Sequence, residues 1–242
     1  MPARFAAVTR KARRVPAPAF STALLVGASR GLGLGLARAY LDGGWRVIAT
    51  ARANDAALRA LARDRRLTVE HVDIADATAV AALRGRLAGE EFDLVFIVAG
   101  ISGPTEPPIH EVAPETVAHV YLANAYHPAR FAEAVADRVR PGGSVAFMSS
   151  FLGSIASNDD AGWETYRASK AAQNMMARSF SVRHPGLAVL SVSPGWVRTD
   201  MGGPEADLDV DTSVRGVVQA IAARRGRPGH AYVHYDGREL PW

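Results

Sequence analysis

Short apolar runs that alternate with helix-like segments restrict the fold of this chain most strongly. Parallel strands that are buried on both faces read as continuous apolar runs, without alternating polar residues. The predicted strands are Thr22–Val26, Trp45–Thr50, Leu67–Val72, Asp93–Val98, Ser144–Met148, Leu187–Val192 and Tyr232–Tyr235. The predicted helices are 32–43, 55–64, 76–88, 114–139, 162–183 and 212–224. This alternation predicts a doubly wound α/β fold: one mainly parallel seven-stranded sheet with helices on both faces, in a single domain.

The first 19 residues differ in composition from the rest of the chain. They contain five basic residues and no acidic one, whereas the remaining chain carries 23 basic and 24 acidic residues. We therefore expect residues 1–19 to form a basic, disordered extension and residues 20–242 to form the domain. Targeting and contact with a partner are the alternatives for the extension. A nearly neutral domain without interleaved basic and aromatic residues argues against a nucleic-acid partner.

The chain has no cysteine, which excludes disulfides, thiolate metal sites and cysteine nucleophiles. Its seven histidines are scattered without metal-ligand spacing, so we expect no metal. No stretch approaches the ~18 uncharged apolar residues of a membrane helix, so we expect no membrane partner. The absence of cysteine fits a reducing compartment, and the expected location is cytoplasmic.

Glycines fill the turn between the first predicted strand and the first predicted helix. Such a turn lets the backbone approach the pyrophosphate of a dinucleotide, with the phosphates at the helix N-terminus. The sequence therefore predicts a dinucleotide site, and a strand-to-helix turn without a ligand is the alternative. The predicted contacts in this turn are Gly27, Ser29, Arg30, Gly31, Leu32 and Gly33.

The end of the second predicted strand indicates which dinucleotide binds. An acidic residue there would bind the ribose 2′-hydroxyl of NAD, whereas a cation accepts the 2′-phosphate of NADP. The chain reads Ala49-Thr50-Ala51-Arg52, without Asp or Glu. Arg52 and Arg30 offer planar donors suited to phosphate, so NADP(H) is the predicted cofactor. The alternative is that both arginines are solvated surface residues.

Further motifs follow in a fixed order along the chain. A Ser149-Ser150 pair ends a predicted strand, Tyr166 and Lys170 form a Y-x-x-x-K sequence, and 194–199 reads P-G-x-x-x-T. With the glycine turn, these motifs resemble the short-chain dehydrogenase/reductase family from about Ser21 to the C-terminus, in particular its branch of C-factor and sniffer-type carbonyl reductases. The resemblance implies a Rossmann-type fold, a small carbonyl or alcohol substrate, and assembly as a homodimer or homotetramer.

The resemblance also assigns residues beyond the glycine turn. It implies that Asn124 holds a water of the proton relay and that Lys170 binds the nicotinamide ribose. One segment departs from the family: Ile97-Val98-Ala99-Gly100 stands where Asn-Asn-Ala-Gly is usual, although the backbone can still approach a cofactor there. The other implied cofactor contacts are Asp73, Ile74, Ala99, Gly100, Tyr166, Pro194, Gly195, Val197 and Thr199.

The chemistry of the Tyr166–Lys170 pair follows from its spacing. Residues four apart share one face of a helix, and an adjacent ammonium stabilises a phenolate and lowers its pKa. We therefore expect Lys170 to lower the pKa of Tyr166. Tyr166 then acts as general acid/base while the Ser150 hydroxyl polarises the carbonyl oxygen.

Several assignments leave an alternative open. Ser149 could replace Ser150, Asn124 could be a structural residue that kinks its helix, and Asp73 could simply form a turn. The predicted function is hydride transfer between NADP(H) and a small, apolar carbonyl or alcohol. The alternative is a non-catalytic regulatory or signalling protein that binds a nucleotide on the same fold.

Overall fold

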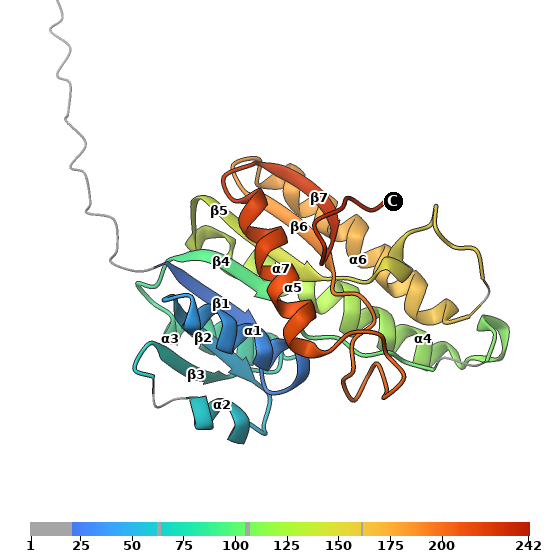
Figure 1. The fold of residues 1–242 in the computed structure, drawn as a ribbon, viewed down its shortest axis with the longest axis horizontal. Helices are drawn as coiled ribbons and strands as arrows, with labels where there is room; N and C mark the ends of the chain where they lie inside the picture. Colours follow the sequence, from blue (N-terminus) through green and yellow to red (C-terminus); the bar gives the residue numbers. More distant parts are fainter. Residues whose placement is uncertain (1–20, 62–63, 105–106, 161) are drawn as a thin grey trace, which may run out of the picture.

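We describe residues 21–242, except 62–63, 105–106 and 161, from a computed structural model (Figure 1). The predicted disorder of residues 1–19 concerns residues outside this range. All strand pairings within the sheet are parallel, in the order β3-β2-β1-β4-β5-β6-β7. The strands are β1 (Thr22–Val26), β2 (Arg46–Ala51), β3 (Leu67–His71), β4 (Phe92–Ile97), β5 (Val139–Met148), β6 (Ala188–Ser193) and β7 (Gly229–His234).

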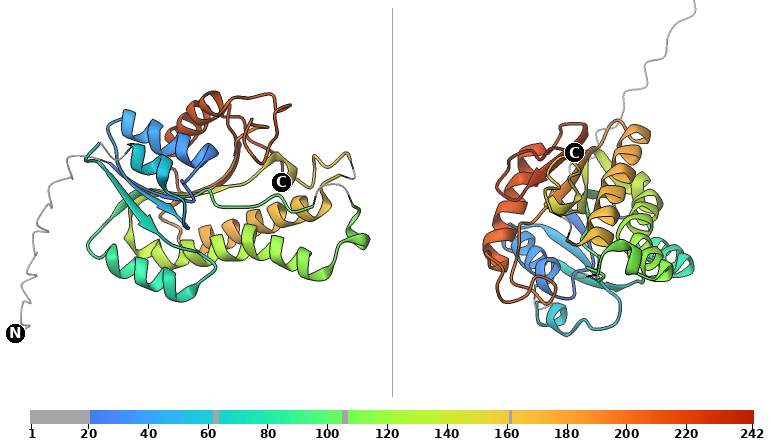
Figure 2. Two further views of the ribbon diagram at one scale, coloured as in Figure 1. Left: turned by 90° about the horizontal axis from the view of Figure 1, so that it is seen from below. Right: turned by 90° about the vertical axis from the view of Figure 1, so that its right-hand side faces the viewer.

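Helices cover both faces of the sheet, as Figure 2 shows most clearly in its left view, with α1, α2 and α7 on one side and α3 to α6 on the other. The α-helices are α1 (Gly31–Asp42), α2 (Ala56–Leu61), α3 (Ala77–Arg86), α4 (Pro114–Tyr121), α5 (His127–Val135), α6 (Glu164–Arg183) and α7 (Val210–Arg224). Short helical segments complete the described chain: η1 (Ile109–Glu111), the π-helical η2 (Leu122–Tyr126), η3 (Ala136–Arg138) and η4 (Phe151–Gly153).

Successive residues of each central strand enter two separate cores. In β1, Ala23 and Leu25 pack in the cluster under α1 and α7, while Leu24 and Val26 pack in the cluster under α3, α5 and α6. Side chains alternate between the two faces of a strand, so a strand covered on both faces needs apolar residues at every position. This requirement explains the unbroken apolar runs, and the predicted fold class is confirmed.

The structure differs most from the predicted elements in two places. β5 begins at Val139, five residues before the predicted start, through a segment that contains Pro141 and two glycines. The predicted helix 114–139 is divided into α4, η2, α5 and η3. Pro128 has no N–H to donate to the carbonyl of Asn124, four residues earlier, and the π-helical turn accommodates this gap.

The winding direction reverses between β1 and β4, which are neighbours at the centre of the sheet. Open parallel sheets bind ligands outside the carboxyl ends of their strands at such a reversal. The glycine turn follows β1, and Ser149 and Ser150 follow β5, so both predicted parts of the site lie at this edge.

Replacement of Phe180 in α6 tests the packing of the second core. Phe180 is fully buried, with its ring centroid 6.2 Å from that of Phe147. Phe180→Ala should lower the free energy of unfolding by ~3–5 kcal/mol because it leaves a cavity. Ser179→Ala, at an exposed position of the same helix, should change it by less than ~0.5 kcal/mol. Equal effects of the two changes in urea unfolding would contradict this packing.

Candidate active site

The glycine turn is packed too closely for side chains. Gly27 has a φ of +87°, and a Cβ built on it would lie 2.9 Å from the Cα of Ala99. A Cβ on Gly33 would lie 2.2 Å from the Gly27 carbonyl oxygen. The turn is fixed to the end of β2, since the Gly27 N–H donates to Thr50 Oγ1 at 3.2 Å. No side chain of Gly27, Gly31 or Gly33 covers the N-terminus of α1, where the unpaired amide groups and the helix dipole favour phosphate.

The two arginines predicted to bind the 2′-phosphate are both exposed. Arg52 follows the end of β2 directly, next to the glycine turn that is bonded to Thr50. Arg30 forms an ion pair with the carboxylate of Asp200, 170 residues further along the chain. Asp200 adjoins the P-G-x-x-x-T segment, so this segment and the glycine turn lie side by side. The sequence alone gives no sign of this pair.

Tyr166 and Lys170 lie one turn apart on α6, and both are buried. The Lys170 Nζ lies 5.7 Å from the centre of the Tyr166 ring and donates to the Met148 carbonyl at 2.7 Å and to Gln173 Oε1 at 3.3 Å. These contacts place Tyr166 and Lys170 at the carboxyl end of β5. The predicted juxtaposition of Tyr166 and Lys170 is therefore present.

Burial changes the pKa values of this pair in directions that favour the neutral forms. Burial raises the pKa of Tyr166 to about 12, against the opposing effect of a hydrogen bond with Ser150. Burial lowers the pKa of Lys170 to about 7. Desolvation is the largest influence on the pKa of Tyr166 in the protein without bound cofactor, and the expected lowering of this pKa by Lys170 stays a prediction. A phenol that stays protonated at neutral pH is suited to donating a proton.

The two adjacent serines have different surroundings. Ser149 Oγ donates to Asn174 Oδ1 at 2.7 Å, so its proton is used in this hydrogen bond. The Ser150 hydroxyl lies close enough to the Tyr166 phenol to lower its pKa, and it accepts from the Leu152 N–H at 3.2 Å. Alternation along the extended chain after β5 turns the two side chains to opposite sides. Of the two alternatives, only Ser150 shares its surroundings with the Tyr166 phenol.

Asn124 is fully buried in the π-helical turn η2. Its side-chain oxygen accepts from the Ile101 N–H, and its nitrogen donates to the Ile101 carbonyl, both at 2.8 Å. The same nitrogen donates to Ser169 Oγ at 2.9 Å. Asn124 therefore fixes the loop after β4 against α6. A Cβ added to Gly100 would lie 3.0 Å from Asn124 Oδ1 and 3.4 Å from Lys170 Nζ, so the three residues adjoin.

The remaining predicted contacts also lie at the carboxyl edge. The amide groups of Val98 and Ala99 both donate to the Val26 carbonyl, which holds the loop after β4 beside the glycine turn. The Asp73 carboxylate accepts from the Ala75 N–H at 2.9 Å, a turn-forming contact that matches the alternative for this residue. Pro194, Gly195, Val197 and Thr199 follow β6, Thr199 is near Gly31, and Ile74 follows Asp73 after β3.

A buried polar cluster behind Tyr166 and Ser150 was not predicted. It comprises Gln173 and Asn174 on α6, together with the Tyr232 hydroxyl on β7. Gln173 and Asn174 follow Lys170 by three and four residues, and this helical spacing could have indicated that they lie beside it. For Tyr232 no local signal existed, because the contact joins segments 82 residues apart.

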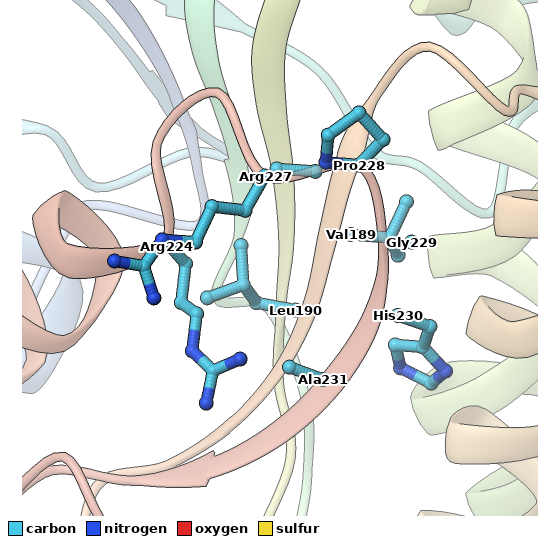
Figure 3. A pocket seen from close by; sticks show the side chains of 9 residues that line it. Val189, Leu190, Arg224, Arg227, Pro228, Gly229, His230 and Ala231 are labelled. Carbon is cyan, nitrogen blue, oxygen red and sulfur yellow. The ribbon is translucent and has the colours of Figure 1, made fainter.

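A small pocket lies at the opposite end of the sheet, at the amino ends of β6 and β7 (Figure 3). Val189, His230 and Arg227 contribute to its lining. Its volume of about 80 Å³ holds a few waters, whereas small-molecule sites occupy ~300–1,000 Å³. It is therefore unsuited to a dinucleotide. Within the described residues there is no cluster of three or more potential metal ligands, and no helix is both long and apolar enough to cross a membrane.

Comparisons with known proteins agree with this arrangement. The family model described as enoyl-(acyl carrier protein) reductase matches residues 27–230. A solved structure from Burkholderia multivorans, assigned to the short-chain dehydrogenases/reductases and containing NADP, is 43% identical, with a TM-score of 0.89 over 92% of this chain and 100% of that one. The carbonyl reductase Sniffer of D. melanogaster is 31% identical, with a TM-score of 0.81 over 92% and 100% of the two chains. The C-signal of Myxococcus xanthus is 38% identical over 62% of this chain and 92% of its own.

The chain belongs to the short-chain dehydrogenase/reductase family, a class of oxidoreductases. The predicted family is confirmed, and its members similar to this chain include a sniffer carbonyl reductase, as expected, and a C-signal. The NADP in the Burkholderia multivorans structure agrees with the cofactor predicted from Arg30 and Arg52.

The lowered pKa of Lys170 predicts how stability depends on pH. Between pH 7 and 9 the unfolded chain, in which Lys170 has its ordinary pKa of 10.5, binds more protons than the folded protein. The free energy of unfolding should therefore rise with pH in this window, by about 2 kcal/mol. In Lys170→Met the rise should disappear, as measured by urea unfolding of the cofactor-free protein. The same rise in both proteins would show that Lys170 is not the group responsible.

Proposed function

We propose that this protein is an NADP(H)-dependent reductase of small carbonyl compounds, with Tyr166 as general acid/base, Ser150 as the group that polarises the carbonyl, and Lys170 beside them. The observation that supports this proposal most strongly is the burial of Tyr166 next to both the Ser150 hydroxyl and the Lys170 ammonium. A nucleotide-binding protein without chemistry has no need for this arrangement.

The residues at the carboxyl edge fit NADP(H). The closely packed Gly27 and Gly33 leave backbone amide groups uncovered at the N-terminus of α1, which suits the pyrophosphate. Arg52 and Arg30 supply guanidinium groups for the 2′-phosphate. The other expected contacts come from Asp73, Ile74, Ala99, Gly100, Lys170 and 194–199. When bound, the cofactor supplies the hydride that reduces the carbonyl carbon.

Residues of the chain itself transfer the proton and stabilise the charges that develop during the transfer. Tyr166 is protonated at neutral pH, since the pKa of its phenol lies well above 7, and it donates its proton to the carbonyl oxygen as negative charge develops there. The Ser150 hydroxyl donates a hydrogen bond to the same oxygen. Lys170 is held at the Met148 carbonyl, from which it stabilises the phenolate that remains. Asn124 fixes the loop beside Gly100 and Lys170 and orders a relay water there.

The substrate we propose is apolar or aromatic. Phe151, Trp196 and Met201 follow the carboxyl ends of β5 and β6, and each exposes more than 40% of its surface. Half-exposed large side chains beside a polar centre can cover an apolar substituent of the carbonyl. The name of Sniffer, a carbonyl reductase, supports a carbonyl as the group that is reduced.

Loss of the Tyr166 hydroxyl tests the proposed chemistry. Tyr166→Phe should lower kcat for NADPH-dependent reduction of aromatic aldehydes, ketones and diketones by ~10²–10⁴-fold, because the proton donor is removed. Ser150→Ala should also lower kcat strongly, and Ser149→Ala much less. NADPH binding, followed by its fluorescence, should persist in all three. Tight NADPH binding without turnover of any carbonyl would favour the regulatory alternative that the likeness to C-signal suggests.

Arg52 tests the choice of cofactor. Arg52→Ala should raise the Kd of NADPH about tenfold, since one charged hydrogen-bonding partner of the 2′-phosphate is lost, and should leave the Kd of NADH nearly unchanged. Arg65→Ala, at an exposed arginine beyond α2, is the matched control. A wild-type protein that binds NADH more tightly than NADPH would contradict the proposal.

We further propose that the protein is a homodimer or homotetramer located in the cytoplasm. The surface of α4, η2 and α6 exposes the apolar side chains of Tyr121, Leu122, Tyr126 and Met175. Light scattering after size-exclusion chromatography should give at least twice the 25.7 kDa of one chain. A mass of one chain at micromolar concentration would contradict the assembly.

A further inference from the structure

The last strand of the sheet contacts the backbone of Ser150. The Tyr232 hydroxyl on β7 donates a hydrogen bond to the Ser150 carbonyl oxygen. The same oxygen accepts from the Gly153 N–H at 2.9 Å. Tyr232 is 2% exposed, so its hydroxyl has no access to bulk water and depends on this contact.

The surroundings of the Tyr232 hydroxyl are polar and ordered. It also lies within hydrogen-bonding reach of Asn174 and Ser149, which are bonded to each other at 2.7 Å. Burial raises the pKa of Tyr232 to about 12, so the hydroxyl remains a proton donor at all ordinary pH values. The cluster of Tyr232, Asn174 and Ser149 therefore supports the backbone at the Ser150 carbonyl.

The chain after β7 holds the Tyr232 ring in place. The segment turns back, and the Leu240 N–H donates to the Tyr232 carbonyl at 2.9 Å. The Trp242 ring stacks on the Tyr232 ring with centroids 5.2 Å apart and an interplanar angle of 27°. The Trp242 carbonyl accepts from the Ala156 N–H at 2.9 Å, in the loop that follows η4. The position of Tyr232 is thus set from both the strand and the loop beside Ser150.

Backbone bonds fix the other side of Ser150 as well. The Ser149 N–H donates to the Val192 carbonyl at 2.8 Å, and the Phe151 N–H donates to Ser193 Oγ at 2.9 Å. Because the Phe151 N–H and the Ser150 carbonyl belong to the same planar peptide unit, the bond to Ser193 Oγ restrains this plane from one edge. The Gly153 N–H and the Tyr232 hydroxyl restrain the plane from its opposite, carbonyl edge, and rotation of the plane would move the Ser150 side chain relative to Tyr166.

We propose that Tyr232 is a positioning residue that orients the Ser150 hydroxyl toward the substrate carbonyl through its hydrogen bond to the Ser150 backbone. The inference rests on the proposed role of Ser150. A phenylalanine would fill the same space in the core, so the hydroxyl contributes the hydrogen bond and little packing. Small displacements of a catalytic group reduce the rate strongly. Loss of the hydrogen bond between Tyr232 and the Ser150 carbonyl should therefore lower the rate of carbonyl reduction.

Tyr232→Phe tests the inference. We expect kcat for carbonyl reduction to fall about tenfold, because Ser150 is less well oriented, with the Kd of NADPH unchanged. Tyr40→Phe is the matched control: the Tyr40 hydroxyl is also buried and makes no hydrogen bond within the described residues, so kcat should stay at the wild-type value.

A double-mutant cycle separates positioning from a general effect on the fold. If Tyr232 acts through Ser150, Tyr232→Phe should cause no further loss of kcat in a Ser150→Ala background. An equal loss in both backgrounds, or no loss in the wild type, would overturn the inference while a large effect of Ser150→Ala leaves the proposed function intact. If Ser150→Ala itself retains full kcat, the proposed role of Ser150 fails, and the inference fails with it.

Discussion

Burial of both faces of the parallel sheet is the constraint on which the rest of this structure depends. Every residue of β1 is shut off from water, with alternate side chains in two separate cores. Backbone groups in the middle of the sheet pair with neighbouring strands, so unpaired amide groups are available only where strands end. The glycine turn, Ser150 and the 194–199 segment all lie at the carboxyl edge for this reason. The fold thus concentrates the polar chemistry of the chain in one place.

The same burial determines the electrostatics of the site. Tyr166 and Lys170 come from a helix that packs against the second core, and neither side chain reaches bulk water. Desolvation raises the pKa of the phenol and lowers that of the amine, which leaves a protonated donor beside an amine that can change its charge near neutral pH. Arginine could not replace Lys170 in this respect, because its guanidinium stays charged.

The sequence predicted the strands well, because continuous apolar runs leave few alternatives to a sheet covered on both faces. It also predicted that Tyr166 and Lys170 share a helix face, since their spacing alone decides this. It failed where long-range contacts decide the outcome. The Arg30–Asp200 pair joins distant segments, and the first half of β5 contains residues typical of a loop.

Transfer of a deuterium label tests the central claim most directly. The protein would be incubated with NADPH that carries deuterium at both C4 positions and with an aromatic ketone, and the alcohol would be analysed by mass spectrometry. The account predicts an alcohol with one deuterium on the carbinol carbon, formed far more slowly by Tyr166→Phe. Bound NADPH that keeps both deuterium atoms in the presence of every carbonyl tried would contradict it.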